Sequence, residues 1–159
     1  MRLYLKHDVN DSIQVSSNVA NQIKKEIEYG VDKLDTYMKF QKRIDELKSK
    51  IWEFFLDIKK ENKKIVGYGA AAKATTLLNY CGVDKNILPY VVDMNPYKQN
   101  RFLPGTQIPI YNPKKIFETK PDYVLILAWN LKNEVMKQME EITKWGGKFI
   151  TFIPEVQKY

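Results

Sequence analysis

The sequence has very little of the residues that form disulfides, bind zinc or transfer protons. Among its 159 residues are a single cysteine, Cys81, and a single histidine, His7. One cysteine excludes an internal disulfide and a zinc site built from cysteines. One histidine leaves a Ser-His-Asp arrangement with a single candidate base, and we interpret His7 as a surface side chain. We interpret Cys81, in the last turn of a predicted helix, as a small apolar core residue.

The sequence also lacks a long apolar run. The longest, over residues 123–129, is far shorter than the ~20 residues that cross a bilayer. The chain begins MRLYLKHD, which has no apolar region of a signal peptide. We therefore expect a cytoplasmic protein with no membrane partner.

The charge is positive but diffuse. The net charge is +7, a feature that can indicate nucleic-acid binding. The lysines are spread through every segment, and their densest cluster, over residues 59–64, ends a predicted helix, where the helix dipole favours cations. We expect no nucleic-acid partner, although a diffuse positive field would help to attract phosphorylated small molecules.

Residues 1–62 predict a strand followed by a helical arm. Alternating apolar residues predict a short strand over 2–6, and helical spacing predicts a helix over 18–29 that Gly30 stops. A second predicted helix, 33–62, carries an apolar seam with 3,4 spacing: Tyr37, Phe40, Ile44, Leu47, Ile51, Phe54 and Ile58. This seam either lies across the protein's own domain or a neighbouring domain, which we favour, or supports self-association.

Residues 63–159 predict an α/β domain. Strands are predicted over 65–69, 90–93, 107–110, 123–129 and 148–153, and helices over 70–81, after the Asn112-Pro113 pair, and over 131–145. Five strands that alternate with helices indicate a Rossmann-like, mainly parallel sheet flanked by helices. The continuous apolar run of the fourth strand is typical of a sheet centre.

The first candidate site is a glycine turn after the first of these strands. The strand runs into Gly67, Tyr68 and Gly69, and Ala70 opens a helix that begins with small residues. Glycine lets the backbone turn sharply, and small side chains let a ligand approach the amides at the helix start. The alternative is a tight βα turn that binds nothing.

Two charged residues favour the ligand interpretation. Lys73 stands one turn into the helix, where it would either neutralise a phosphate or be an ordinary solvated lysine. Asp93 ends the next strand, where a Rossmann fold places the acid that binds a ribose. However, Ala72 occupies the place of the third glycine of the dinucleotide fingerprint, and no Walker A motif is present.

Two further segments could contribute to a site. The stretch over residues 91–113 contains turn-forming pairs within a long connection, which is either functional or only carries the chain to the sheet edge. Trp129 and Asn130 follow the central strand, at the edge where open α/β sheets place ligands. They would stack on and hydrogen-bond a base or sugar, or else Asn130 caps a helix beside a packed Trp129.

Four motifs in this order carry a family resemblance: GYGAAAKATTLLNYCG, VVDMNPYKQNRFLPGTQIPI, PDYVLILAWN and GGKFITFIP. They resemble the C-terminal domain of the sugar C-methyltransferases, which methylate a ring carbon of deoxysugars attached to dTDP. The resemblance covers residues 1–7 and about 63–155. In that family an N-terminal domain binds zinc through cysteines, a middle domain binds S-adenosylmethionine, and a Rossmann-like C-terminal domain helps to hold the nucleotide-sugar.

The resemblance implies a fragment, either cloned or truncated, because Met1 stands about where members read HGGS. The zinc cysteines and the methyl-donor loop have no counterpart here, so zinc and S-adenosylmethionine are expected in other domains, and no cofactor is expected in this chain. Members carry glycine after a Lys-Gln pair, whereas here Asn100 follows Gln99. Because asparagine tolerates positive φ, we expect the turn to be retained.

The implied substrate-binding residues are Gly67, Tyr68, Gly69, Ala70, Lys73, Asp93, Asn95, Lys98, Trp129 and Asn130. Their roles would be a phosphate cradle, a counter-charge, an acceptor for ribose or sugar hydroxyls, and a platform for a base or sugar. No catalytic residue and no metal ligand is implied. We expect Gly69 and Lys73 to line the main pocket at the carboxyl edge of the sheet, with Asp93 and Asn130 across from them.

The predicted function is that of a domain that holds an NDP-sugar, with a dTDP-sugar as the expected partner, for an S-adenosylmethionine-dependent C-methyltransferase. The chain alone is expected to be inactive. One alternative is a free-standing NAD-type enzyme, against which the missing third glycine and the lack of a Tyr-x-x-x-Lys pair argue. The other is a non-catalytic interaction module that uses the seam of helix 33–62.

Overall fold

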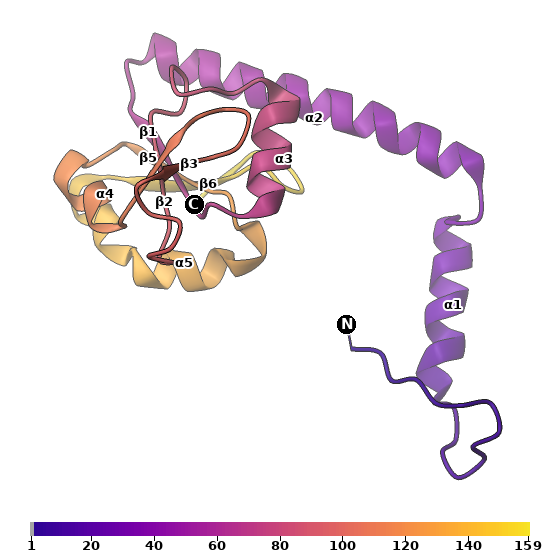
Figure 1. The fold of residues 1–159 in the computed structure, drawn as a ribbon. Helices are drawn as coiled ribbons and strands as arrows, with labels where there is room; N and C mark the ends of the chain where they lie inside the picture. Colours follow the sequence, from indigo (N-terminus) through magenta and orange to yellow (C-terminus); the bar gives the residue numbers. More distant parts are fainter. Residues whose placement is uncertain (1) are drawn as a thin grey trace. The chain divides into compact units, whose positions relative to one another are not determined.

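The computed structural model describes residues 2–159, and the chain divides into two compact units between Ile44 and Asp45. The first unit contains the helix α1, Ser17–Tyr29, and the beginning of α2, Leu34–Lys60. The second contains the rest of α2 and a mixed α/β structure (Figure 1).

The first unit forms its helices where the sequence predicts them. The hydroxyl of Ser16 accepts a hydrogen bond from the amide of Asn18 at the start of α1, and Gly30 ends the helix with φ of +84°. The short strand predicted over 2–6 is wrong: these residues are exposed and pair with no strand. A pattern of alternating apolar residues becomes a strand only where another strand is available to complete its hydrogen bonds.

The second unit contains a sheet with the order β3-β4-β2-β1-β5-β6-β7. In chain order the strands are β1 Ile65–Tyr68, β2 Val91–Val92, β3 Arg101–Phe102, β4 Pro109–Tyr111, β5 Tyr123–Ile126, β6 Lys148–Thr151 and β7 Gln157–Lys158. The parallel strands β4, β2, β1, β5 and β6 are the five that the sequence predicts. Numbered along the chain, they follow the Rossmann order 3-2-1-4-5. The edge strands β3 and β7 are antiparallel, exposed and not predicted.

Helices cover both faces of this sheet. They are α3 Ala72–Cys81, α4 Lys114–Thr119 and α5 Lys132–Gln138, with 3₁₀ turns η1 at Trp129–Leu131 and η2 at Glu140–Trp145. Alternate strand residues enter two separate apolar clusters, one with α2 and α3 and the other with α4 and α5 (Figure 1). The single helix predicted over 131–145 is wrong, because the chain leaves helical geometry at Met139.

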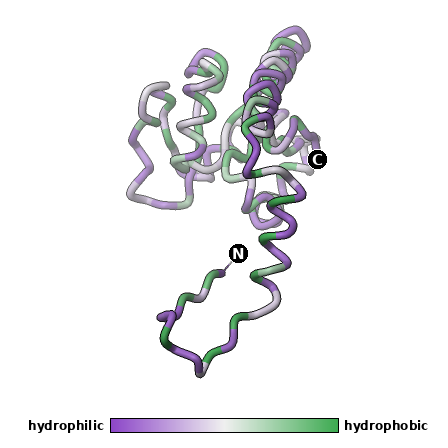
Figure 2. Tube along the Cα trace, turned by 90° about the vertical axis from the view of Figure 1, so that its right-hand side faces the viewer, coloured by the Kyte–Doolittle hydropathy of each residue, from purple (hydrophilic) through white to green (hydrophobic). Residues whose placement is uncertain are grey.

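The two ends of the apolar seam of α2 differ in burial. Ile51, Phe54 and Ile58 are buried in the cluster that covers the sheet of the second unit. Tyr37 and Phe40, which belong to the first unit, are more than half exposed. Figure 2 shows apolar residues recurring among polar ones along these helices. Over its second half the seam therefore covers the chain's own sheet, which is one of the two favoured arrangements that the sequence left open.

Among residues 2–159, none of the helices combines the length and the apolar character that crossing a membrane requires.

Candidate functional site at the carboxyl edge

The carboxyl ends of β1, β2 and β5 meet at one edge of the sheet. Tyr68 of β1 stands in register with Val92 of β2 and Ile126 of β5. The chain continues from β1 to β2 and β4 on one side, and β5 and β6 lie on the other side. The direction of strand order therefore changes between β1 and β5, which is where doubly wound sheets bind ligands.

The glycine turn after β1 leaves backbone donors at this edge. Gly69 has φ of +99°, and a Cβ atom on it would lie 3.0 Å from the Cβ of Ala128 and 3.3 Å from its amide nitrogen. Glycine is thus required where the turn passes the end of β5. The amides of Ala71, Ala72 and Lys73 have no hydrogen-bond acceptor among the described residues. The start of α3 therefore presents three free donors.

Lys73 reaches across the point where the strand order changes. Its ammonium donates a hydrogen bond to the side-chain oxygen of Asn130 and lies 4.3 Å from the centre of the Trp129 ring. The structure thus brings together Lys73 from α3 with the two residues that follow β5. Asn130 lies inside the 3₁₀ turn η1, so the alternative in which it caps a helix is not observed.

Asp93 ties the glycine turn to the loop that follows β2. One carboxylate oxygen accepts hydrogen bonds from the amide of Ala70 at 2.7 Å and from the ammonium of Lys98 at 3.2 Å. The other accepts the amide of Asn95 at 2.8 Å. A carboxylate has about four acceptor positions, so Asp93 retains about one for a ligand. Its main contacts are made within the protein.

The loop after β2 is held by residues that the sequence motifs contain. Asn95 and Lys98 lie at the edge through their bonds to Asp93. Gln99, which was not predicted as a site residue, donates from its side chain to the carbonyl of Asp93 at 2.9 Å. Gln99 could have been predicted as a site residue because it follows Lys98, which was itself predicted to lie at the site. Asn100 has φ of +60°, which confirms the expected positive φ.

Two of the predicted contact residues lie inside the sheet. Gly67 is a buried β1 residue, where a Cβ would come within 2.7 Å of the Val91 side chain. The Tyr68 side chain is buried in the core, where its hydroxyl donates to Gln138 at 2.9 Å and burial raises its pKa. The structure therefore gathers Gly69, Ala70, Lys73, Asp93, Asn95, Lys98, Trp129 and Asn130 at the edge, but not the Tyr68 side chain.

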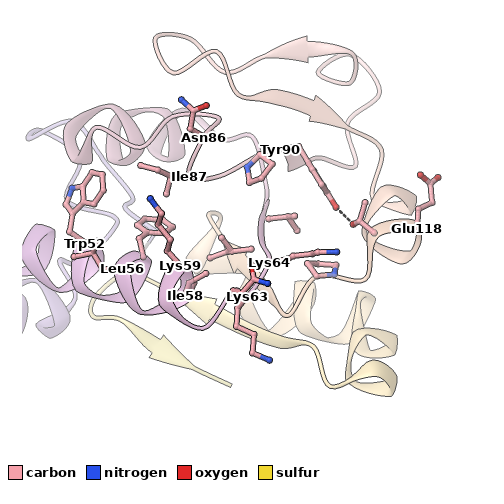
Figure 3. A pocket seen from close by; sticks show the side chains of 17 residues that line it. Trp52, Leu56, Ile58, Lys59, Lys63, Lys64, Asn86, Ile87, Tyr90 and Glu118 are labelled. Carbon is pink, nitrogen blue, oxygen red and sulfur yellow. Dashed lines mark hydrogen bonds between the residues drawn. The ribbon is translucent and has the colours of Figure 1, made fainter.

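A well-formed cavity lies away from this edge. It measures about 910 Å³ and is lined by residues that precede or begin strands, together with α2 (Figure 3). Gly69, Lys73, Asp93 and Asn130 do not line it, so the expectation that they form the main pocket is wrong. At the carboxyl edge several of these side chains and backbone groups bond to one another.

Comparison with known proteins decides the family. Residues 1–154 match the family described as the C-methyltransferase C-terminal domain. The chain belongs to this family. The resemblance noted in the sequence motifs is confirmed by this match.

The chain is also similar to a curated protein and to a solved structure. It is 34% identical over 142 residues to the C-methyltransferase NovU of Streptomyces niveus, an alignment that covers 89% of this chain and 34% of that protein. The chain thus spans about a third of the length of this relative. A solved structure, UDP-D-quinovosamine 4-dehydrogenase from Vibrio fischeri, is 26% identical with a TM-score of 0.42, over 58% of this chain and 79% of that chain.

The carboxyl edge presents hydrogen-bond donors, which are the groups that an anion requires. The groups that remain available are three backbone amides at the start of α3, which have no acceptor among the described residues, and the ammonium of Lys73, which bonds to Asn130 rather than to a carboxylate. The carboxylate of Asp93 is already engaged by donors of the protein. Binding and orientation, rather than proton transfer, are what such a set of groups performs.

Proposed function

We propose that this domain holds the diphosphate of a nucleotide-sugar at the carboxyl edge of its sheet, with a dTDP-deoxysugar as the ligand. The observation that carries the proposal is the group of three free amides at the start of α3 beside the ammonium of Lys73. In this proposal the domain serves an S-adenosylmethionine-dependent C-methyltransferase that acts on the sugar.

Electrostatics favours a phosphate at this position. The N-terminus of a helix carries the positive end of its dipole, equivalent to about half an elementary charge, and α3 is 10 residues long. Lys73 adds a full positive charge one turn further on. The contact of its ammonium with Trp129 and Asn130 holds that charge in place without neutralising it.

The remaining edge residues have assigned roles in the proposal. The Trp129 ring provides a surface on which a base or sugar stacks, and the Asn130 amide hydrogen-bonds a polar group of the same ligand. Lys98 adds positive charge that Asp93 partly neutralises. Asp93 contributes one acceptor position for a hydroxyl, beside its larger role in holding the turn.

The same charges argue against S-adenosylmethionine as the ligand of this domain. The methyl donor carries a positive sulfonium, and Lys73 would place a second cation beside it in a partly shielded site. We infer that the methyl donor and zinc bind in other parts of the longer protein, and that this chain alone transfers no methyl group.

Isothermal titration calorimetry tests the proposal with dTDP, NAD and S-adenosylmethionine. We expect weak binding of dTDP and none of S-adenosylmethionine. The variant Lys73→Gln should lower the affinity for dTDP about fivefold, because it removes one charged hydrogen-bond donor that is partly exposed.

The matched control is Lys114→Gln, which removes the lysine at the start of α4 and should leave the affinity unchanged. Tight binding of S-adenosylmethionine, preference for NAD over dTDP, or equal effects of the two lysine variants would each contradict the proposal.

A further inference from the structure

The cavity at the amino edge of the sheet has apolar walls that remain accessible. Trp52 and Leu56 of α2 lie on one side and Ile87, from the loop before β2, on the other (Figure 3). Leu56 is 51% exposed, although its helix is otherwise packed on the sheet at this point. An exposed apolar surface of this kind, gathered around a cavity, is typical of a site that takes an apolar group.

Two polar side-chain groups of these walls are already paired within the protein. The indole nitrogen of Trp52 donates to the carbonyl of Cys81 at 2.8 Å. The hydroxyl of Tyr90 is hydrogen-bonded to Thr119. The interior of the cavity therefore offers mainly apolar contact, and any charged part of a ligand must lie at its rim.

The rim carries positive charge without matching negative charge. Three lysines line the cavity, Lys59, Lys63 and Lys64, and Glu118 is the only acidic residue that does. Lys63 pairs with Asp122, and Glu118 pairs with a lysine outside the cavity. Lys59 and Lys64 have no carboxylate within 4.0 Å among the described residues. Two unpaired ammonium groups thus adjoin an apolar interior.

This cavity is separate from the carboxyl-edge site. Its lining includes Lys64 and Ile65, where β1 begins, and Pro121, which precedes β5. The glycine turn lies at the other end of β1. A strand of four residues spans about 13 Å, so a single small ligand bound in the cavity does not occupy the carboxyl edge.

We propose that the amino-edge cavity binds a small amphipathic acid, with an apolar body against Trp52, Leu56 and Ile87 and its anionic group near Lys59 and Lys64. The volume of about 910 Å³ lies within the range of about 300–1,000 Å³ for small-molecule sites. The charges of the two lysines stabilise the bound anionic group, and the removal of apolar surface from water stabilises the bound apolar body.

Two naphthalene dyes with the same apolar body test both halves of this proposal on the full chain. The dye 1-anilinonaphthalene-8-sulfonate carries an anionic group, whereas N-phenyl-1-naphthylamine does not. The sulfonate dye should bind with one-to-one stoichiometry, and its fluorescence should rise on binding.

The apolar wall is tested by Leu56→Glu. This variant should weaken binding of the sulfonate dye at least tenfold, because it places a carboxylate in the apolar wall. The matched control is Ile23→Glu on α1, a residue that is also 51% exposed and lies outside the cavity.

The charge requirement is tested by the double variant Lys59→Gln/Lys64→Gln. It should weaken the sulfonate dye about tenfold, from two partly exposed ionic contacts, and leave the uncharged dye unchanged. The control Lys25→Gln/Lys33→Gln makes the same change in net charge and should affect neither dye.

Displacement identifies the chemical class. Either decanoate or 3-phenylpropanoate should displace the sulfonate dye, whereas dTDP should not. Displacement by decanoate would indicate an aliphatic acid, and displacement by 3-phenylpropanoate would indicate an aromatic acid. Failure of both acids, displacement by dTDP, or an effect of Ile23→Glu as large as that of Leu56→Glu would overturn the proposal.

Discussion

The two edges of the sheet are built in different ways. At the carboxyl edge the groups come from residues that follow strands directly, such as Gly69, Asp93 and Asn130, and they bond to one another. At the amino edge the walls come from α2 and from the loop before β2, which are distant in sequence. The first edge is polar and internally hydrogen-bonded, and the second has apolar walls around a cavity. A site that follows from strand ends is thus visible in a sequence, whereas one formed by helix packing is not.

The largest expected change in stability concerns the close contact between the glycine turn and the end of β5. Gly69→Ala should lower the free energy of unfolding by about 3 kcal/mol, because it combines an unfavourable positive φ with a contact to Ala128. Gly82→Ala provides the control: this glycine also has positive φ, but its added Cβ would meet nothing within 4 Å. It should cost only about 1 kcal/mol. Urea denaturation measures both, and equal losses would mean that the approach of the turn to β5 is not tight.

Removal of the Asp93 carboxylate should have the next largest effect. Asp93→Ala leaves the buried amide of Ala70 without an acceptor and Lys98 without its partner, which should cost about 2 kcal/mol of stability. If the residue acts mainly by holding the glycine turn, the affinities for dTDP and for inorganic pyrophosphate should fall by the same factor. The alternative is that Asp93 contacts the deoxyribose of the nucleotide. In that case the variant would bind dTDP more weakly but would bind pyrophosphate, which has no sugar, as well as the wild type does. Calorimetry with the two ligands distinguishes these outcomes.

The sequence predicts the parallel part of the fold because that part depends on local patterns. The apolar runs 65–69 and 123–129 contain the buried strands Ile65–Tyr68 and Tyr123–Ile126, and Gly30 and Gly82 end their helices with positive φ. The edge strand 101–102 has two exposed residues and no pattern of its own, so it forms only because β4 is beside it.

The position of the candidate site, like the parallel strands, was predictable because it depends on local sequence patterns. Lys73, Asp93 and Asn130 all follow strands, and parallel strands bring their carboxyl ends to one edge. The contacts that these residues make were not predictable, because the pairing of Asp93 with the Ala70 amide depends on the three-dimensional course of the turn. The amino-edge cavity depends on how α2 packs against the sheet, and no local pattern reports that packing.

A smaller effect is expected where α2 joins the wall of the amino-edge cavity. Trp52→Phe retains the apolar ring but removes the hydrogen bond to the Cys81 carbonyl, which should cost about 1 kcal/mol. Trp129→Phe is the control at the opposite edge, because the indole nitrogen of Trp129 has no acceptor among the described residues. Its effect on thermal stability should be smaller. A larger loss for Trp129→Phe would reverse the assigned roles of the two indoles.

The smallest expected effect is a pH-dependent one at the start of β5. Asp122 accepts the amide of Lys64 at 2.8 Å and the ammonium of Lys63 at 3.1 Å. Burial alone would raise the pKa of Asp122, but these hydrogen bonds and the lysine charge outweigh it and lower the pKa below its ordinary value of 3.8. Because the folded state then holds the proton less tightly than the unfolded state, the carboxylate stabilises the fold above pH 3.8 and loses that contribution as the pH falls through the lowered pKa.

Asp122→Asn should therefore cost about 0.5 kcal/mol at pH 7, a value reduced by solvent screening because both side chains of the pair are more than a third exposed. The difference between variant and wild type should shrink at pH 3, as measured by urea denaturation at both values. Asp57→Asn, which removes a more exposed ion pair with Lys60, should change stability less at pH 7. A loss for Asp122→Asn that is the same at pH 3 and pH 7 would show that the carboxylate acts through packing or neutral hydrogen bonding rather than through its charge.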